Sequence, residues 1–399
     1  MREDGRRVPA LAECVIRMTF QPFSRLMWRP KLVNGGRFAP LEKPCFVYGN
    51  HSHNYDPFIF NMFTPWMDST TGVLTKEYFR NKFMHDALLN VELYPTRKHV
   101  PEPHLIRNIY KQINLNRSFL IYPEGGRRWA GQPIPWIDST AKIFAKFELP
   151  VYPIITEGSY ISWPRWAKYP RPARMRITLG EPMRFNRKMP IEDVLAKLKA
   201  PIDFDETLMP DELKPKWAFR PAVGIHRLLY RDPDTGDNGA IFTPDGTYVE
   251  NRAGTLRYKM LPDSTLLNEK TGKIVTTATL YNAVKALPLT TNKEGIIVEE
   301  NVDLYEEPKF PELIPHGKGT LRLYPDRVWF KSDSIDTQIP IEEVLYVGVE
   351  RNYMLQVFLA DKMLQACFKG AGSALQWQDT LLRMKAERED KQVSASGAK

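Results

Sequence analysis

The sequence predicts an α/β protein followed by two β-rich regions, and three observations support this fold class. Between about residues 44 and 180, short apolar runs alternate with segments of helical periodicity. After Ala200 the composition shifts to proline and charged residues, and the last hundred residues alternate like antiparallel strands. We therefore expect a mixed sheet with helices on both faces, then a ribbon of β-hairpins, then a β module with a C-terminal helix. At 399 residues the chain is long enough for two or three domains.

The first thirty residues predict an amphipathic helical segment. Apolar side chains recur at the i, i+3, i+4, i+7 spacing of one helical face, at Leu11, Cys14, Val15 and Met18. Arg17 falls on the opposite face, and Pro22 is expected to stop the pattern. Such a segment either lies in the plane of a membrane interface or covers the core of its own domain.

The α/β region contains six candidate strands and five candidate helices. The strands are expected at 45–48, 72–74, 91–94, 119–122, 151–155 and 174–179. The helices are expected at 57–63, 78–89, 105–115, 140–147 and 191–198.

The region after Ala200 starts with a charged, proline-rich stretch, followed by an expected helix at 222–230. The segment PDGTYVENRAGTL from Pro244 recurs as PDSTLLNEKTGKI from Pro262, which predicts two β-hairpins. Strands are then expected at 320–324, 327–331, 344–350, 354–359 and 363–369, with a helix at 374–384. Curled strands closed by one helix indicate a pleckstrin-homology-like module. The predicted domains are 1–30, 31–205, 206–290 and 291–399.

The net charge of +9 fits nucleic acid, anionic lipid or phosphate-bearing small molecules as partners. Residues 1–40 hold only three acids but eight basic residues, which are Arg2, Arg6, Arg7, Arg17, Arg25, Arg29, Lys31 and Arg37. Between residues 157 and 181 five more, Arg165, Lys168, Arg171, Arg174 and Arg176, are mixed with Trp and Tyr. Basic residues beside such rings suit a membrane interface, and a solvated basic loop is the alternative. The sequence contains no recognisable nucleic-acid module, so we predict no nucleic-acid partner.

The compartment follows from cysteine use and the N-terminus. Three scattered cysteines, Cys14, Cys45 and Cys367, form no CxxC pair, which indicates a reducing, cytosolic setting. The N-terminus has charges inside its apolar stretch and makes a poor signal peptide. No uncharged apolar run reaches the roughly 18 residues of a spanning helix. We expect a soluble or peripheral protein.

The strongest local signal for chemistry is the segment Tyr48-Gly49-Asn50-His51-Ser52-His53-Asn54-Tyr55-Asp56-Pro57, between a strand and a helix. A neutral imidazole can take a proton from a hydroxyl near pH 7, and a carboxylate on its other nitrogen fixes its tautomer. His51 and Asp56 have the spacing for this pair. A cap or a core hydrogen bond is the alternative use of such a pair. His51, His53 and Asp56 do not have binuclear metal-site spacing, so we predict no metal and no cofactor.

Two further motifs end strands with basic residues. In the segment from Ile121 to Arg128, glycines allow close backbone approach and the two arginines, Arg127 and Arg128, offer bidentate phosphate recognition, which predicts a phosphate site. Upstream, residues 92–98 end in Arg97 and Lys98, and downstream residues 149–154 form an apolar run framed by prolines.

In this order the motifs resemble those of the glycerolipid acyltransferase superfamily, which includes bacterial lysophosphatidic acid acyltransferases. That superfamily carries NHxxxxD, a strand ending in Arg, a PEG-type motif with Arg, and a proline-framed strand; the match covers about residues 10–200. The resemblance implies a glycerolphosphate acyltransferase-like domain with His51 as general base and Asp56 as its orienting partner. It also implies substrate-binding roles, assigned to Asn50, Arg97, Glu124, Gly125 and Arg127.

The implied reaction is direct transfer of an acyl group from acyl-CoA or acyl carrier protein to lysophosphatidic acid or a related lysophospholipid, on the inner face of the cell membrane. Here the usual Phe-Pro-Glu-Gly-Thr-Arg-Ser is Tyr122-Pro123-Glu124-Gly125-Gly126-Arg127-Arg128, with two hydroxyls lost and one charge gained. The middle segment is similar to a zinc-ribbon insert, but Asp232, Thr235, Tyr258 and Leu261 replace the cysteines, which implies a metal-free ribbon. The alternative is a catalytically inactive lipid-binding scaffold of the same fold.

Overall fold

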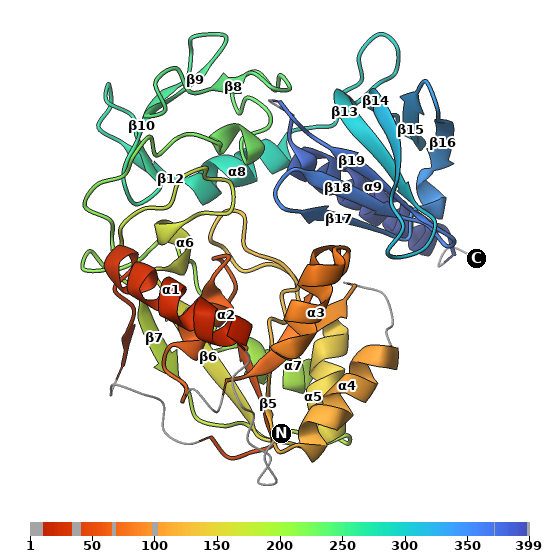
Figure 1. Ribbon diagram of the computed structural model, residues 1–399. Coiled ribbons are helices and arrows are strands. Elements are labelled where there is room, and N and C mark those ends of the chain that lie inside the picture. The colour runs from red at the N-terminus through yellow and green to blue at the C-terminus, as the bar shows by residue number, and fades with distance from the viewer. Residues whose placement is uncertain (1–10, 34–40, 66–68, 98–102, 371, 397–399) are drawn as a thin grey trace. The chain divides into compact units, whose positions relative to one another are not determined.

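The computed structural model describes residues 11–33, 41–65, 69–97, 103–370 and 372–396 (Figure 1). Arg2, Arg6, Arg7 and Arg37 of the basic N-terminal set lie outside these residues. The chain divides into two units, each with its own internal contacts. The first comprises Met1–Arg165, Tyr169–Pro221 and Leu261–Thr265; the second comprises Trp166–Lys168, Ala222–Met260 and Leu266–Lys399.

The first unit is built on a seven-stranded sheet. Its spatial order is β1 (Lys31–Leu32), β7 (Arg176–Leu179), β6 (Val151–Glu157), β2 (Cys45–Gly49), β5 (Ser118–Ile121), β3 (Thr71–Thr75) and β4 (Leu93–Thr96). Each of the six predicted strands is present. Strands β6, β2, β5, β3 and β4 are parallel, whereas β7 is antiparallel to β6. The loops that follow the five parallel strands therefore meet at one edge of the sheet.

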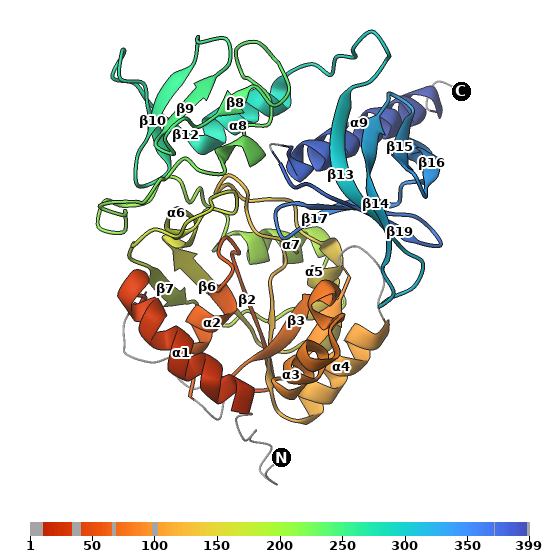
Figure 2. The same ribbon diagram turned by 45° about the horizontal axis from the view of Figure 1, so that its top comes forward.

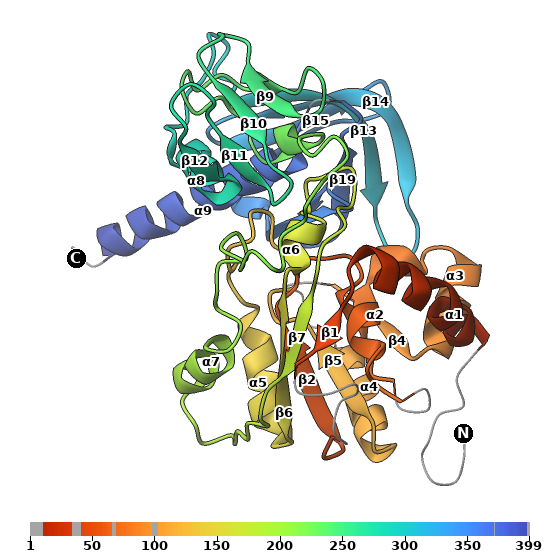
Figure 3. The ribbon, with the colours of Figure 1, turned by 90° about the vertical axis from the view of Figure 1, so that its left-hand side faces the viewer.

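Helices cover both faces of this sheet, as predicted (Figure 3). They are α1 (Leu11–Met27), α2 (Asp56–Asn61), α3 (Lys82–Asn90), α4 (Pro103–Asn114), α5 (Asp138–Phe147), α6 (Ser159–Ser162) and α7 (Ile191–Lys199), with a 3-10 turn η2 (Lys76–Phe79).

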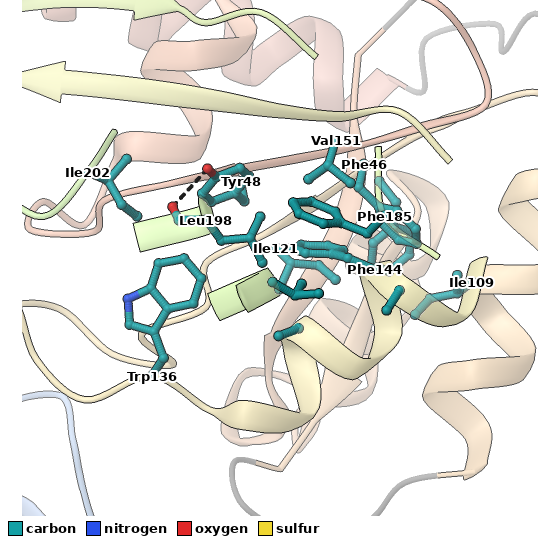
Figure 4. Close-up of a cluster of buried hydrophobic side chains, with 14 of the residues drawn as sticks. Phe46, Tyr48, Ile109, Ile121, Trp136, Phe144, Val151, Phe185, Leu198 and Ile202 are labelled. Carbon is teal, nitrogen blue, oxygen red and sulfur yellow. Dashed lines mark hydrogen bonds between the residues drawn. The ribbon is translucent and has the colours of Figure 1, made fainter. Parts of the chain in front are cut away.

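Successive side chains of β2 enter opposite cores because side chains alternate along a strand. Phe46 and Tyr48 pack with Phe144 of α5 and Leu198 of α7 (Figure 4). Cys45 and Val47 pack on the other side, with Trp28 and Ile59. A strand buried on both faces has a continuous apolar sequence, which explains why these strands are recognisable from sequence.

Helix α1 differs from its prediction in length and in orientation. It continues past Pro22, which lies on its exposed side, to Met27, and the buried Trp28 that follows anchors the end of the helix in the core. The predicted apolar face points outward, with Met18 69% exposed, whereas Arg17 is buried. The Arg17 guanidinium donates to the backbone oxygen of Thr64 at 3.4 Å and to Ser69.

The second unit begins with a five-stranded sheet in the order β12 (Ile274–Thr276), β11 (Thr265–Leu267), β10 (Arg257–Met260), β9 (Tyr248–Asn251) and β8 (Ile241–Phe242). The predicted hairpin strands lie in it, and the unpredicted helix α8 (Thr277–Ala286) follows. The helix expected at 222–230 is wrong: only a 3-10 turn, η3 (Ile225–Arg227), forms there. Gly224 has a φ of 103°, which an α-helix does not accommodate.

A seven-stranded antiparallel sheet and a long helix complete the second unit (Figure 2). The sheet order is β16 (Asp336–Pro340), β15 (Arg327–Ser332), β14 (Ile314–Leu323), β13 (Val298–Glu307), β19 (Met363–Cys367), β18 (Met354–Phe358) and β17 (Tyr346–Glu350); a 3-10 turn, η4 (Ile341–Glu343), precedes β17. Helix α9 (Ala374–Ser396) packs on β17 and β18. Within the described residues, no helix combines the length and apolar character that crossing a bilayer requires.

Replacement of Phe144 by alanine tests the central core. Phe144 is fully buried, with its ring 5.0 Å from that of Phe46, so Phe144→Ala is expected to lower the free energy of unfolding by about 3–5 kcal/mol. Phe83→Ala on α3 is the control, since that ring is 78% exposed; its change should stay within about 0.5 kcal/mol. Urea unfolding followed by circular dichroism measures both, and equal losses in the two variants would contradict the assignment of the core.

Candidate active site

His51 and Asp56 meet in the loop that joins β2 to α2. The His51 ring Nδ1 lies 2.9 Å from Asp56 Oδ2, and the same oxygen accepts the backbone N–H groups of Ser52 at 3.0 Å and His53 at 2.9 Å. The ionised Asp56 carboxylate can only accept a hydrogen bond, so Nδ1 of His51 carries the hydrogen. The basic lone pair of the neutral imidazole is therefore on Nε2. The His51 side chain is 19% exposed and the Asp56 side chain 2%, so the orienting carboxylate is buried while the ring reaches solvent.

The second oxygen of Asp56 binds a serine at the start of α6, directly after β6. Ser159 Oγ donates to Asp56 Oδ1 at 2.6 Å. Gly158, which precedes it, has a φ of 83°, and a Cβ there would lie 2.4 Å from the Arg174 carbonyl oxygen. Burial acts to raise the pKa of Asp56, but the hydrogen bond and charge of His51, together with Ser159, outweigh it and hold that pKa below its ordinary value. The carboxylate is therefore ionised and fixed.

The turn after β5 supports His51 from its other side. The Tyr122 ring stacks on the imidazole with centroids 4.3 Å apart and an interplanar angle of 22°. The backbone N–H of Arg128 donates to the His51 carbonyl oxygen at 2.9 Å. The PEG-type turn and the His51 loop thus form one packed structure.

A buried charge network lies beneath this packed structure. Arg128 pairs with Glu124 at 2.6 Å and with Glu206 at 3.3 Å, and also donates to the carbonyl oxygens of Ile202 and Phe204. Burial acts to lower the pKa of Arg128, but the two carboxylates raise it above its ordinary value, so the guanidinium stays charged. Burial raises the pKa of Glu124 to about 7 and also raises that of Glu206, in both cases against the effect of Arg128.

Glu206 connects this network to the loop that carries His51. Its Oε1 accepts from Asn50 Nδ2 at 3.1 Å and from the Ser52 hydroxyl, and its Oε2 accepts the Tyr160 backbone N–H at 3.0 Å. The Asn50 side chain also bonds the Thr156 backbone in both directions, at 2.8 and 2.9 Å. The buried side chains of Asn50 and Glu206 therefore join the segments at the ends of β2, β5 and β6.

The structure brings together six of the seven predicted site residues. Asn50, His51, Asp56, Glu124, Gly125 and Arg127 belong to the loops that follow the adjacent strands β2 and β5. Arg97 follows β4 at the same edge, separated from β2 by β5 and β3. Strand β4 is therefore three strand spacings, about 14 Å, from β2, which sets Arg97 apart from the other predicted site residues. The polar atoms of Asn50 and Glu124 are buried against protein partners, whereas Arg127 is partly exposed.

Ser159 and Glu206 were not predicted as site residues, and Arg128, predicted to offer phosphate recognition, instead pairs with two protein carboxylates. Arg128, Ser159 and Glu206 are buried, and the last two contact the loop that carries His51 from 103 and 154 positions away. An i, i+4 Glu-Arg pair was available as a signal for Arg128. A lone serine and a lone glutamate offered none.

The basic and aromatic run at 157–181, predicted to face a membrane, is mostly internal, and that prediction is corrected. Tyr160, Trp166, Arg165 and Arg171 are buried. Arg165 lies 4.2 Å from the Trp129 ring centroid, and Arg171 donates to the carbonyl oxygens of Pro221 and Pro262. Carbonyl and π partners inside the unit account for the burial of these guanidinium groups.

His53, part of the apparent metal motif, is buried with its ring 4.4 Å from that of Trp28, and its Nδ1 accepts the Tyr55 backbone N–H at 3.1 Å. Burial lowers the pKa of His53 to about 3, so the ring is neutral. Among the residues that the structure describes, no cluster of three or more His, Cys, Asp or Glu side chains is arranged to hold a metal ion.

Comparison with known proteins gives one family and two kinds of structural similarity. Residues 32–157 match the Acyltransferase family model. A search of curated proteins found no match. The chain is similar to the crystal structure of the 1-acyl-sn-glycerophosphate (LPA) acyltransferase PlsC from Thermotoga maritima, with 16% identity, a TM-score of 0.38, and coverage of 48% of this chain and 77% of that one. It is also similar to the N-terminal PH domain of human ARAP2, with 12% identity, a TM-score of 0.19, and coverage of 25% and 87%.

Glu206→Ala tests the buried network. It leaves Arg128 with one of its two carboxylates and leaves Asn50 and Ser52 without this acceptor, so the free energy of unfolding is expected to fall by about 3–5 kcal/mol. Glu212→Ala is the matched control, because that carboxylate is 59% exposed and pairs with Arg176 at 3.7 Å; a change within about 0.5 kcal/mol is expected. Urea unfolding compares the two, and a Glu206 loss no larger than the Glu212 loss refutes the network's structural role.

His53→Asn tests the neutral buried imidazole through pH dependence. The folded pKa of about 3 lies below the unfolded value of 6.5, so the unfolded chain binds the extra proton and stability falls as pH drops through this window. Between pH 7 and pH 5, wild type should lose about 2 kcal/mol more than His53→Asn. Chemical unfolding at the two pH values measures this, with His104→Asn, an exposed histidine, as control. Parallel losses in wild type and His53→Asn are the contradicting result.

Proposed function

We propose that this chain, whose residues 32–157 match the Acyltransferase family model, acts as a member of the glycerolipid acyltransferase superfamily and transfers a fatty acyl group from acyl-CoA or acyl carrier protein to a hydroxyl of lysophosphatidic acid or a related lysophospholipid. The observation that carries the proposal is the His51 ring, oriented through Nδ1 by the buried Asp56 carboxylate and reaching solvent at the carboxyl edge of a parallel sheet. That edge is where open α/β sheets bind their ligands.

The reaction is direct transfer. His51 Nε2 takes the proton of the acceptor hydroxyl while the oxygen attacks the thioester carbonyl, and Asp56 stabilises the imidazolium that forms. The tetrahedral intermediate then collapses, the C–S bond breaks, and the imidazolium returns the proton to the departing thiolate. The ester and the free thiol are the products. Cys45 does not suit an acyl-enzyme intermediate, because burial raises the pKa of its thiol to about 11.

The acceptor phosphate is assigned to Arg127, with Arg97 at the same sheet edge. Arg127 is partly exposed on the PEG-type turn, where Gly125 adopts a φ of 63°. The additional arginine of this turn, Arg128, is buried and paired with Glu124 and Glu206, so it is not available to bind a headgroup phosphate. Asn50 and Glu124 accordingly hold the loops in position, and their part in substrate binding is indirect.

Membrane association is proposed to be peripheral, from the cytoplasmic side. The apolar stripe of α1 supports it, since Val15, Met18, Phe23 and Leu26 are exposed while Arg17 is buried on the opposite side. An amphipathic helix with its apolar side outward suits an interfacial position. The seven antiparallel strands β13 to β19 and helix α9 support a pleckstrin-homology-like module in the second unit.

Thiol release from palmitoyl-CoA in the presence of lysophosphatidic acid tests the proposed reaction. Wild type should release thiol only with acceptor, and His51→Ala should lower the rate by about 10²- to 10⁴-fold, because the general base is lost. His85→Ala is the control, since this histidine lies on α3 with 41% of its side chain exposed. Equal rates in wild type and His51→Ala sink the assignment. No release by wild type, with palmitoyl-CoA or palmitoyl carrier protein, favours the inactive scaffold.

A further inference from the structure

We propose that residues 214–220, Lys-Pro-Lys-Trp-Ala-Phe-Arg, form a second lipid-contacting element of the first unit, which inserts Trp217 and Phe219 at the headgroup level of an anionic bilayer. This segment, called here the Trp217 loop, lies outside the region that matches the family model. The inference deepens the proposed membrane association by naming a second contact point beside α1.

The first support is the exposure of large apolar side chains. Trp217 is 62% exposed and Phe219 57% exposed, and Leu208 nearby in sequence is 70% exposed. Large aromatic side chains are normally mostly buried, so two of them presented to solvent within three residues indicate a contact surface. By contrast, the aromatic residues of the run at 157–181 are mostly internal.

The second support is that the loop is held at both ends. The backbone N–H of Arg174 donates to the Leu213 carbonyl oxygen at 3.2 Å. The buried Arg171 donates to the Pro221 carbonyl oxygen at 2.8 Å. Between these points the Phe219 ring meets the Tyr169 ring edge-on, with centroids 5.1 Å apart. The ends of the loop and the Phe219 ring are therefore held in place before any contact, which reduces the conformational entropy lost on insertion.

The third support is the charge around these rings. Lys216 and Arg220 are exposed on either side of Trp217 and Phe219. The acidic neighbours already have partners, since Asp211 pairs with Lys214 at 2.8 Å and Glu212 lies 3.7 Å from Arg176. Trp beside Lys and Arg suits the boundary between headgroups and acyl chains, where basic residues meet anionic lipid. An anionic bilayer meets both features at once, with headgroup charge for Lys216 and Arg220 and an apolar interior for the two rings.

The fourth support is the position of the loop relative to α1. Residues 173–175 run between the two elements: the N–H groups of Ala173 and Met175 donate to the carbonyl oxygens of Met27 and Trp28, and the N–H of Arg174 points the other way, to Leu213. Two chain spacings, about 10 Å, therefore separate the end of α1 from the start of the loop. Leu26 at the end of α1 is 75% exposed. Both elements belong to the first unit, so the distance between them is set within one body.

Co-sedimentation of the full chain with vesicles tests the proposal. We use phosphatidylcholine vesicles with and without phosphatidylglycerol, and compare wild type, Trp217→Ser, Lys216→Gln/Arg220→Gln, and Tyr110→Ser as control. Tyr110 is 44% exposed on α4 of the same unit, so it matches the loss of an exposed aromatic ring. Trp217→Ser should weaken partitioning into the anionic vesicles by about tenfold, through lost apolar insertion. The charge variant should lose most of the phosphatidylglycerol and salt dependence, and Tyr110→Ser should bind like wild type.

The outcomes separate this proposal from the proposed reaction. Partitioning of Trp217→Ser equal to wild type overturns the loop as a lipid contact, provided that unfolding midpoints show all variants folded. If Trp217→Ser loses binding to an acidic carrier protein while its binding to vesicles stays intact, the lipid contact is overturned in favour of a protein partner. Thiol release by wild type with dispersed short-chain acceptor is measured without vesicles. If wild type releases no thiol in this assay but vesicle binding depends on Trp217, the proposed reaction fails and the lipid contact stands. If wild type releases thiol but Trp217→Ser binds vesicles like wild type, the reaction stands and the lipid contact fails.

Discussion

The candidate site depends on the hydrogen bonds that the Asp56 carboxylate accepts. One oxygen receives the His51 ring and two backbone N–H groups of the loop that carries His51, and the other receives the Ser159 hydroxyl. An ionised carboxylate is stable in a buried position only with such a set of donors, because burial alone favours the neutral acid. The same four bonds shape the loop, start α2, orient the imidazole and join the loop to the segment after β6.

The charge network around Arg128 performs a different task. It places one cation between two carboxylates contributed by different segments, and the Asn50 amide and Ser52 hydroxyl extend it to the loop that carries His51. Buried ion pairs of this kind add little net stability compared with apolar packing, but they are sensitive to the loss of either partner. The network's contribution is therefore to define one arrangement of three loops.

Much of the first unit could be predicted from sequence, because its features leave local patterns. Strands buried on both faces have continuous apolar runs, and the six expected strands are present. The pairing of His51 with Asp56 spans one loop and follows from spacing. The roles of Ser159 and Glu206 could not be predicted, because a contact across more than one hundred residues leaves no periodicity. Periodicity also identified α1 as amphipathic without indicating that Arg17 turns inward, which depends on its partners Thr64 and Ser69. Strand β13 was missed since its glutamates mask the alternation.

The position of Glu206 also bears on how the domain that carries the candidate site can be exchanged between proteins. The region that carries the family motifs ends at residue 157, and the sheet ends with β7, yet the counter-charge of Arg128 is supplied from beyond α7. A domain boundary drawn at the last strand or at the last helix would remove an acid that the loop carrying His51 depends on. The unit of modular inheritance is therefore longer than the motif-bearing segment, and recombination within 158–206 must keep both halves of the charge network together.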